Sequence, residues 1–168
     1  MPGVSNVGKV NEFLYRGSQP NLESLRELKK LGITTIVELR GKYIGHVERE
    51  RKSVESVGLR FVDIPASGWS PPPDDQVVQF LSLMQQRPRE KMYVHCWLGD
   101  DRTGVFIATY RIVYDHWTAQ QAIDEMSHFH FNAFWHPSMK EYVRNFPAHF
   151  AESPAFAGLR DKASSPER

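Results

Sequence analysis

The sequence predicts an α/β domain with a central, mainly parallel sheet of four or five strands flanked by helices. Two observations support this fold class. Short runs rich in β-branched residues alternate along the chain with segments of helical periodicity. The length of 168 residues is sufficient for one such domain to bury a sizeable hydrophobic core.

The first half of the chain contains three strand signals separated by two helix signals. Residues 13–15 begin a strand, residues 33–39 form a strongly β-branched strand, and residues 59–64 form a third. An amphipathic helix is expected over residues 21–31 and a charged helix over residues 46–57. Each helix is followed by a glycine, Gly32 or Gly58, as is typical of helix ends.

The second half begins with a run of three prolines at residues 71–73, which favours an extended loop. A helix over residues 74–86, a buried strand over residues 91–94 and helices near residues 103–115, 118–128 and 137–150 are then expected. No repeat or second domain is apparent. Residues 1–152 are therefore expected to form a single domain, and the polar residues 153–168 a disordered tail.

Composition excludes several classes of protein. The net charge of +1 gives no global field that would attract nucleic acid or an anionic membrane. No signal-peptide-like stretch begins the chain, and no segment is long enough to span a bilayer. The single cysteine cannot form an internal disulfide, so a cytoplasmic location is expected. The histidines lack the spacing of a metal site, so neither metal nor cofactor is expected, and the oligomeric state stays open.

The most informative segment runs from His95 to Gly104, with the sequence HCWLGDDRTG. Cys96 is followed by five residues and then by Arg102, between an expected strand and an expected helix. Such a loop points consecutive backbone N–H groups, with the positive end of the helix dipole, at one spot. A phosphate there would be bound by the forked guanidinium of Arg102 and by the loop. The phosphate-binding residues are expected to be Trp97, Leu98, Gly99, Asp100, Asp101 and Arg102.

Cys96 is the candidate nucleophile, because helix N-termini and nearby cations favour the reactive thiolate. The hydroxyl of Thr103 is expected near the sulfur, and His95 is expected to bond a backbone carbonyl. A buried structural cysteine would explain Cys96 alone but not Gly99, Arg102 and Thr103. At typical residue frequencies those matches arise by chance at roughly one in several thousand cysteines.

The run His-Cys-x5-Arg-Thr-Gly resembles the signature loop of the cysteine-dependent, protein-tyrosine-phosphatase-like phosphatases. Residues 12–20 resemble the opening strand of small bacterial and fungal dual-specificity-like members. Residues 59–81 are similar to the acid-loop region of that group and of tyrosine-phosphatase-like inositol phosphatases. The resemblance covers about residues 10–150. It implies a four- or five-stranded sheet and a two-step mechanism through a phosphocysteine.

The general acid is less evident. Families of this kind usually place an aspartate after the third strand, but the matching position falls near Ser67 and Gly68, which cannot donate a proton. Asp74 is an alternative, although it also suits a helix start. Asp101 is preferred to Asp74, because myotubularin-like and Sac-like lipid phosphatases resemble this chain in having an aspartate there that serves as acid.

Further residues are candidates for a substrate rim. Arg40 and Lys42 follow a strand at the carboxyl edge of the sheet, where ligands bind in such folds, and Arg16 is expected to reach the same edge. Trp69 and Trp97 are expected to flank the pocket. Solvated charges and plain packing remain alternatives for Arg40, Lys42 and Trp69.

Two function classes follow. The first is a phosphatase for dual-specificity-type phosphoprotein substrates or inositol (poly)phosphates. The second is a phosphate-binding pseudophosphatase or interaction module with little turnover, motivated by the missing upstream acid. The expected partner is thus a phosphoprotein or a phosphorylated small molecule, with neither nucleic acid binding nor membrane insertion.

Overall fold

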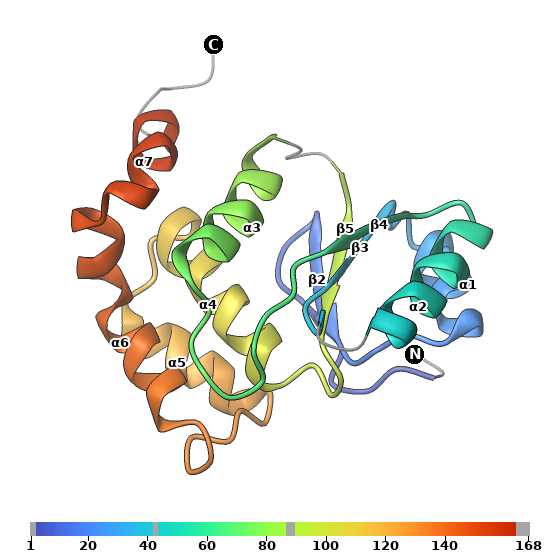
Figure 1. The fold of residues 1–168 in the computed structure, drawn as a ribbon, viewed down its shortest axis with the longest axis horizontal. Coiled ribbons are helices and arrows are strands. Elements are labelled where there is room, and N and C mark those ends of the chain that lie inside the picture. The colour runs from blue at the N-terminus through green and yellow to red at the C-terminus, as the bar shows by residue number, and fades with distance from the viewer. Residues whose placement is uncertain (1–2, 42–43, 87–89, 164–168) are drawn as a thin grey trace.

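The computed structural model describes residues 3–41, 44–86 and 90–163. They form one five-stranded sheet in the order β1-β2-β5-β3-β4, with β1 antiparallel to β2 and the other neighbours parallel (Figure 1). The strands are β1 (Gly8–Lys9), β2 (Leu14–Gly17), β3 (Thr35–Glu38), β4 (Arg60–Asp63) and β5 (Met92–His95). The expected mainly parallel sheet is therefore confirmed, and the short strand β1 was not anticipated.

Helices cover both faces of the sheet. They are α1 (Leu22–Lys30), α2 (Ile44–Ser56), α3 (Asp74–Gln86), α4 (Asp101–Tyr114), α5 (Ala119–His128), α6 (Pro137–Glu152) and α7 (Ala157–Ala163), with a 3₁₀ turn η1 at Pro154–Phe156. Helices α1 and α2 lie on one face, and α3 to α6 lie on the other (Figure 1). The sequence placed the helices of residues 21–150 to within a few residues.

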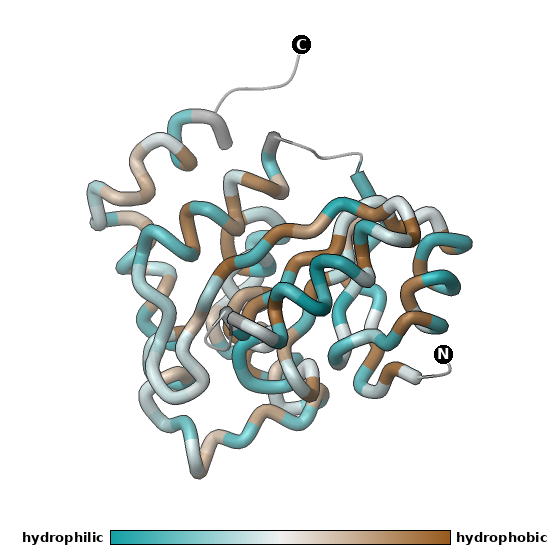
Figure 2. The backbone as a smooth tube through the Cα atoms, turned by 45° about the vertical axis from the view of Figure 1, so that its right-hand side comes forward, coloured by the Kyte–Doolittle hydropathy of each residue, from teal (hydrophilic) through white to brown (hydrophobic). Residues whose placement is uncertain are grey.

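Two hydrophobic cores follow from the alternation of side chains along each strand. Val94 of β5 and Val37 of β3 face the larger core under α3 to α6. Their neighbours Tyr93 and Ile36 face the smaller core under α1 and α2. In Figure 2 the hydrophobic stretches run along the strands in the middle of the molecule, while the outer helices alternate hydrophobic and hydrophilic turns. A sheet buried on both faces explains why its strands read as nearly continuous apolar runs.

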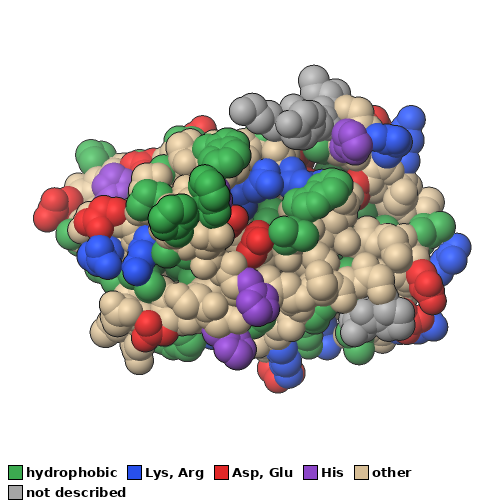
Figure 3. All heavy atoms as spheres, turned by 90° about the horizontal axis from the view of Figure 1, so that it is seen from below, with side chains coloured by type: hydrophobic (Ala, Val, Ile, Leu, Met, Phe, Trp, Pro, Cys, Tyr) green, Lys and Arg blue, Asp and Glu red, His purple; other side chains and the backbone are tan. Residues whose placement is uncertain are grey.

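The carboxyl ends of the parallel strands meet at the lower end of the molecule in Figure 1, and Figure 3 looks onto that end. The loop from Cys96 to Asp100 leaves β5 there and leads into α4. Because β5 is flanked by β2 and β3, residues from both neighbouring strands surround the start of this loop.

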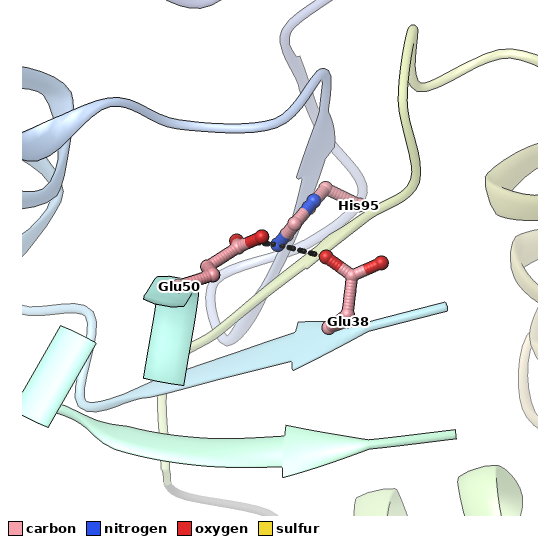
Figure 4. Close-up of side chains that lie close together, drawn as sticks. All are labelled: Glu38, Glu50 and His95. Carbon is pink, nitrogen blue, oxygen red and sulfur yellow. Dashed lines mark ion pairs between the residues drawn. The ribbon is translucent and has the colours of Figure 1, made fainter. Parts of the chain in front are cut away.

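A buried ionic cluster joins three elements next to this loop (Figure 4). The His95 Nε2 atom lies 2.8 Å from Glu50 Oε1 and 3.5 Å from Glu38 Oε2. The guanidinium of Arg40 lies 2.8 Å from Glu38 Oε1 and 2.6 Å from Glu50 Oε2. The cluster therefore holds β3, β5 and α2 together from inside the protein.

Both ring nitrogens of His95 face acceptor oxygens, because Nδ1 lies 3.0 Å from the carbonyl of Cys96. Burial disfavours the imidazolium, but the carboxylates of Glu50 and Glu38 outweigh it and raise the pKa of His95 above 6.5. The imidazole thus lies between a carboxylate and the backbone of the loop, and its surroundings favour the charged form.

The expectation of a disordered tail from residue 153 is wrong for the residues that the structure describes. Residues 154–163 continue as η1 and α7, and the side chain of Phe156 is fully buried. Its ring packs against Phe146 and Phe150 of α6, with ring centroids 5.7 Å and 5.3 Å away. Phe156 and Leu159 thus extend the larger hydrophobic core, and Arg160 donates to the carbonyls of Phe150 and Ser153, so that the segment is docked on α6. Residues 164–168 lie outside the described residues.

No helix in the described part of the chain combines the length and the apolar character that crossing a membrane requires.

We predict that Phe156→Ala lowers the free energy of unfolding by about 3–5 kcal/mol, because the docked segment loses its main buried contact. Urea unfolding followed by circular dichroism measures the change. Glu152→Ala, at an exposed position nearby, should change stability by less than about 0.5 kcal/mol. Equal stability of the two variants would show that the segment contributes nothing to the fold.

We also predict a pH effect from the buried cluster. Since the pKa of His95 is raised, its stabilising contribution is complete below pH 6.5 and is lost as the pH rises through the higher value in the folded state. His95→Asn should therefore flatten the decline of unfolding free energy between pH 6.5 and the alkaline range. His116→Asn, at an exposed site with a positive φ that asparagine tolerates, should keep the wild-type slope. A wild-type slope in His95→Asn would contradict the assignment.

Candidate active site

Cys96 lies directly after β5 with its side chain buried, and α4 begins five residues later at Asp101. The helix therefore points its N-terminus at the loop of residues 96–100, as the spacing predicted. Within the described residues, the sulfur has one polar contact, with Asp100 Oδ1 at 3.9 Å.

The backbone carbonyls of the loop all turn outward to donors from other parts of the chain. The carbonyl of Cys96 faces His95 Nδ1, that of Trp97 accepts from the backbone of Gln19 at 3.2 Å, and that of Leu98 accepts from Asn6. The carbonyl of Gly99 accepts from Asn6 Nδ2 at 3.1 Å and from Arg16 Nη2 at 2.8 Å. Every carbonyl from residue 96 to residue 99 thus has a partner outside the loop.

The N–H groups show the opposite pattern. Those of Trp97, Leu98 and Gly99 meet no acceptor among the described residues. In a trans peptide the N–H points away from the preceding carbonyl, so outward carbonyls turn these donors toward the inside of the loop. Free N–H groups in front of a helix N-terminus form a cradle for an anion.

Arg102 completes the cradle. Its guanidinium forms no ion pair with any described acid, and Gly68 lies against it: a Cβ atom at Gly68 would be 3.7 Å from Arg102 Cζ. The loop of residues 65–73 thus forms a wall beside the guanidinium. A partly exposed arginine without a partner is available to bind a phosphate through two parallel hydrogen bonds.

Asp100 and Thr103 make other contacts than the sequence predicted. Asp100 caps α4, because its Oδ1 accepts from the backbone N–H of Asp101 at 2.7 Å, and this turns the carboxylate toward the sulfur of Cys96. The hydroxyl of Thr103 is buried and has no hydrogen-bond partner among the described residues. The predicted contact between Thr103 and the sulfur is therefore absent, since the capping carboxylate takes the nearby position.

Asp101 points toward the segment between α5 and α6. Its Oδ1 accepts from the backbone of Asn132 at 3.0 Å, and its Oδ2 lies 3.1 Å from Nε2 of the buried His136. Burial raises the pKa of Asp101, the Asn132 hydrogen bond opposes this, and the charge of Asp100 adds to it. Trp69 packs on the ring of His136 at 5.4 Å, so the loop beside Arg102 also contacts this pair.

Asp74, the alternative acid, has a structural position. Its Oδ1 lies 2.7 Å from His149 Nε2, and its Oδ2 accepts from the hydroxyl of Ser153 at 3.0 Å. Both oxygens therefore bind the end of α6, which ties α3 to the C-terminal segment.

A cavity of about 370 Å³ opens beside the cradle and is lined by Arg40, His46, Val47, Trp97 and Arg102. In Figure 3 basic side chains lie in a hollow at this end of the molecule, between groups of hydrophobic side chains. The exposed rings of Trp69 and Trp97 belong to the two loops that flank Arg102. Trp97 lines the cavity, whereas Trp69 is not among its lining residues and packs on His136.

The expected basic rim is wrong at Arg16, whereas Arg40 lies at the cavity. Arg16 is buried beneath the loop with a relative exposure of 1%, because β2 runs beside β5 and directs this side chain inward. Arg40 does line the cavity, but its donors bind Glu38, Glu50 and Gln19. Lys42 lies outside the described residues.

Glu38, Glu50 and His95 bring three possible metal ligands within 4.8 Å of one another. The guanidinium of Arg40 already binds both carboxylates, so this cluster is balanced by an internal cation and does not fit a metal ion.

Sequence reasoning missed Glu38, Glu50, Asn6 and His136. Two of them carried a signal: Glu38 interrupts an apolar strand, and Glu50 shares the buried face of α2 with Val47 and Val54. An acidic residue at such a position requires a buried partner. Asn6 and His136 carried none, since their partners lie far away in the sequence.

Comparison with known proteins supports the family that the signature loop indicated. Residues 5–145 match the family model described as "DSP-PTPase phosphatase fused to NAD+ Kinase". The chain is 31% identical over 124 residues to the dual specificity protein phosphatase TpbA of Pseudomonas aeruginosa, covering 73% of this chain and 54% of that protein. It is 29% identical over 128 residues to dual specificity protein phosphatase 26 of Rattus norvegicus, covering 73% and 58%. The chain thus spans little more than half the length of these curated relatives.

Solved structures show the same architecture. The crystal structure of P. aeruginosa TpbA superposes with a TM-score of 0.74 at 26% identity, covering 98% of this chain and 94% of that chain. The catalytic core of the PP-IP phosphatase SIW14 from S. cerevisiae superposes with a TM-score of 0.72 at 20% identity, covering 94% of each chain. The fold and the family model together show that the chain belongs to the dual-specificity phosphatases of the protein-tyrosine-phosphatase-like superfamily.

Proposed function

We propose that this chain hydrolyses phosphate monoesters through a phosphocysteine formed on Cys96. The observation that carries the proposal is the arrangement of the loop. The carbonyls of residues 96–99 bind donors outside it, while the N–H groups of residues 97–99 have no acceptor in the part of the chain that the structure describes. A tetrahedral anion is the ligand that such a cradle, a helix N-terminus and an unpaired arginine recognise together.

The reaction follows in two steps. The thiolate of Cys96 attacks phosphorus, an S–P bond forms, and the P–O bond to the leaving group breaks while an acid protonates the departing oxygen. Water then attacks phosphorus while the carboxylate of the acid accepts its proton, the S–P bond breaks, and phosphate leaves with the thiolate and the acid restored. The N–H groups and Arg102 stabilise the equatorial oxygens in both steps.

We assign the acid to Asp101. Burial keeps its pKa raised, which suits a proton donor, and Asp101 adjoins Arg102 in the signature loop. His136 Nε2 lies 3.1 Å from Asp101 Oδ2. Asp74 is the weaker candidate because it lies outside the signature loop, at the start of α3, where His149 and Ser153 bind it to the end of α6.

The lining of the cavity favours substrates with a single phosphate group, such as phosphoproteins. Trp97 and Val47 offer apolar walls to an aryl or alkyl leaving group, and the charge of Arg40 is matched by two carboxylates. Arg16 and Arg40, two cations of the expected substrate rim, instead bind groups of the protein itself. The relative TpbA has been crystallised with phosphotyrosine, which supports the same substrate class.

We predict that Cys96→Ser abolishes release of phosphate from p-nitrophenyl phosphate yet retains binding of phosphate, because the cradle and Arg102 remain. Arg102→Lys should also lose most activity, since a point charge cannot replace a bidentate fork. Phosphate release is measured with malachite green, and binding by the shift in melting temperature. Turnover in Cys96→Ser would refute the covalent mechanism, and a wild type that binds phosphate without turnover would identify a pseudophosphatase.

We predict that Asp101→Asn lowers kcat by roughly 10²-fold or more on an alkyl phosphate such as phosphoserine peptide but spares p-nitrophenyl phosphate, whose leaving group needs no proton. Asp74→Asn is the matched control: it should leave this dependence on the leaving group unchanged and reduce stability instead. Selective loss in Asp74→Asn, with none in Asp101→Asn, would move the acid to the loop after β4.

A further inference from the structure

Arg16 is a charged side chain in the interior that the proposed reaction does not use. It lies on β2 with a relative exposure of 1%, and its guanidinium stacks on the ring of Phe129 at 4.0 Å. Nη2 donates to the carbonyl of Gly99 in the signature loop, whereas Nε and Nη1 have no hydrogen-bond partner among the described residues. Unpaired donors on a buried cation are costly, so their retention calls for a reason.

Charge pairing separates Arg16 from the other arginines of the interior. Arg40 has Glu38 and Glu50 within 2.8 Å, and Arg111 has Glu125 at 2.6 Å and Asp115 at 2.7 Å. Within the described residues Arg16 forms no such ion pair. The negative groups that act on it are Glu125, already bound to Arg111, and then Cys96 and Asp100 of the loop.

Burial lowers the pKa of Arg16 to about 10, so the side chain still carries its charge at neutral pH. Glu125 and the groups of the loop favour that charge, while Arg111 opposes it. Arg16 therefore keeps a positive charge directly beneath the loop without a carboxylate in contact among the described residues.

Arg16 also sets the orientation of the loop backbone. Gly99 has a φ of +76°, and a Cβ atom there would lie 2.3 Å from the carbonyl of Gly17, so the loop rests directly on the end of β2. Arg16 and Asn6 hold the Gly99 carbonyl outward. In the same peptide unit the N–H of Asp100 must then point the opposite way, into the cradle.

We propose that Arg16 is a positioning residue whose counter-ion is the phosphoryl group held in the cradle, and that it acts through the Gly99 peptide and through its buried charge. The inference rests on the proposed phosphatase function, since it requires an anion in the loop. The buried charge of Arg16 lowers the stability of the protein without a ligand, and an anion bound in the loop compensates for this loss.

Orthovanadate is a suitable probe, because it is a tetrahedral anion that binds where phosphate does without being hydrolysed. Arg16→Met keeps the length and the apolar stem of the side chain but removes the charge. It should leave the free energy of unfolding without vanadate unchanged or higher, weaken the Kd for vanadate by about tenfold or more, and lower kcat/KM in parallel. Urea unfolding and vanadate titration give the two readouts on the same protein.

Arg111→Met is the control for stability, since Arg111 is a partly buried arginine that also stacks on an aromatic ring, Trp117. Removing it leaves Glu125 and Asp115 without their cation, so it should lower the free energy of unfolding without vanadate. Arg16→Met should not lower that free energy, so the two variants are expected to differ in stability.

A second pair of variants tests the charge itself if Arg16→Met does not fold. Arg16→Lys should keep vanadate affinity within a few-fold of the wild type, and Arg16→Gln, which keeps a hydrogen-bond donor, should lose it. Wild-type affinity in Arg16→Met or in Arg16→Gln would overturn the inference and leave a packing role. A wild type that binds no vanadate would instead refute the phosphatase proposal, and this inference with it.

Discussion

The orientation of the peptide groups between Cys96 and Asp100 is the constraint on which the candidate site depends. A loop presents its N–H groups to an anion only when its carbonyls find donors elsewhere, because buried backbone groups without partners are costly. Here the donors come from Asn6, Arg16, Gln19 and His95, which lie on three separate segments. The N-terminal segment and β2 are therefore as much a part of the site as the loop itself.

Buried charge supports this loop in two different ways. The cluster behind it places the carboxylates of Glu38 and Glu50 between Arg40 and His95, and it joins α2 to β3 and β5. Arg16 has no such carboxylate in contact among the described residues, so its charge remains available to an anion in the loop.

The wall of the site is built from segments that meet only in the folded protein. Asp101 binds the segment before α6 through Asn132 and His136, and Trp69 closes the same group from the loop after β4. This group lies beside Arg102, whose guanidinium lines the cavity together with Trp97. The C-terminal segment stabilises the packing of these helices, since Asp74 and Phe156 join α3, α6 and the 3₁₀ turn.

The sequence by itself determined the alternation of strands and helices, the mainly parallel sheet and the loop around Cys96 and Arg102. These features are local: they follow from periodicities of 2.0 and 3.6 residues and from a spacing within one loop. The tertiary structure decided the burial of Arg16, the ion pairs of Arg40, the partners of Asp101 and the docking of residues 154–163. Each depends on which strand lies beside which, and on contacts between residues far apart in the chain. Arg16 illustrates the reason: its place beneath the loop follows from the pairing of β2 with β5, which no local pattern encodes.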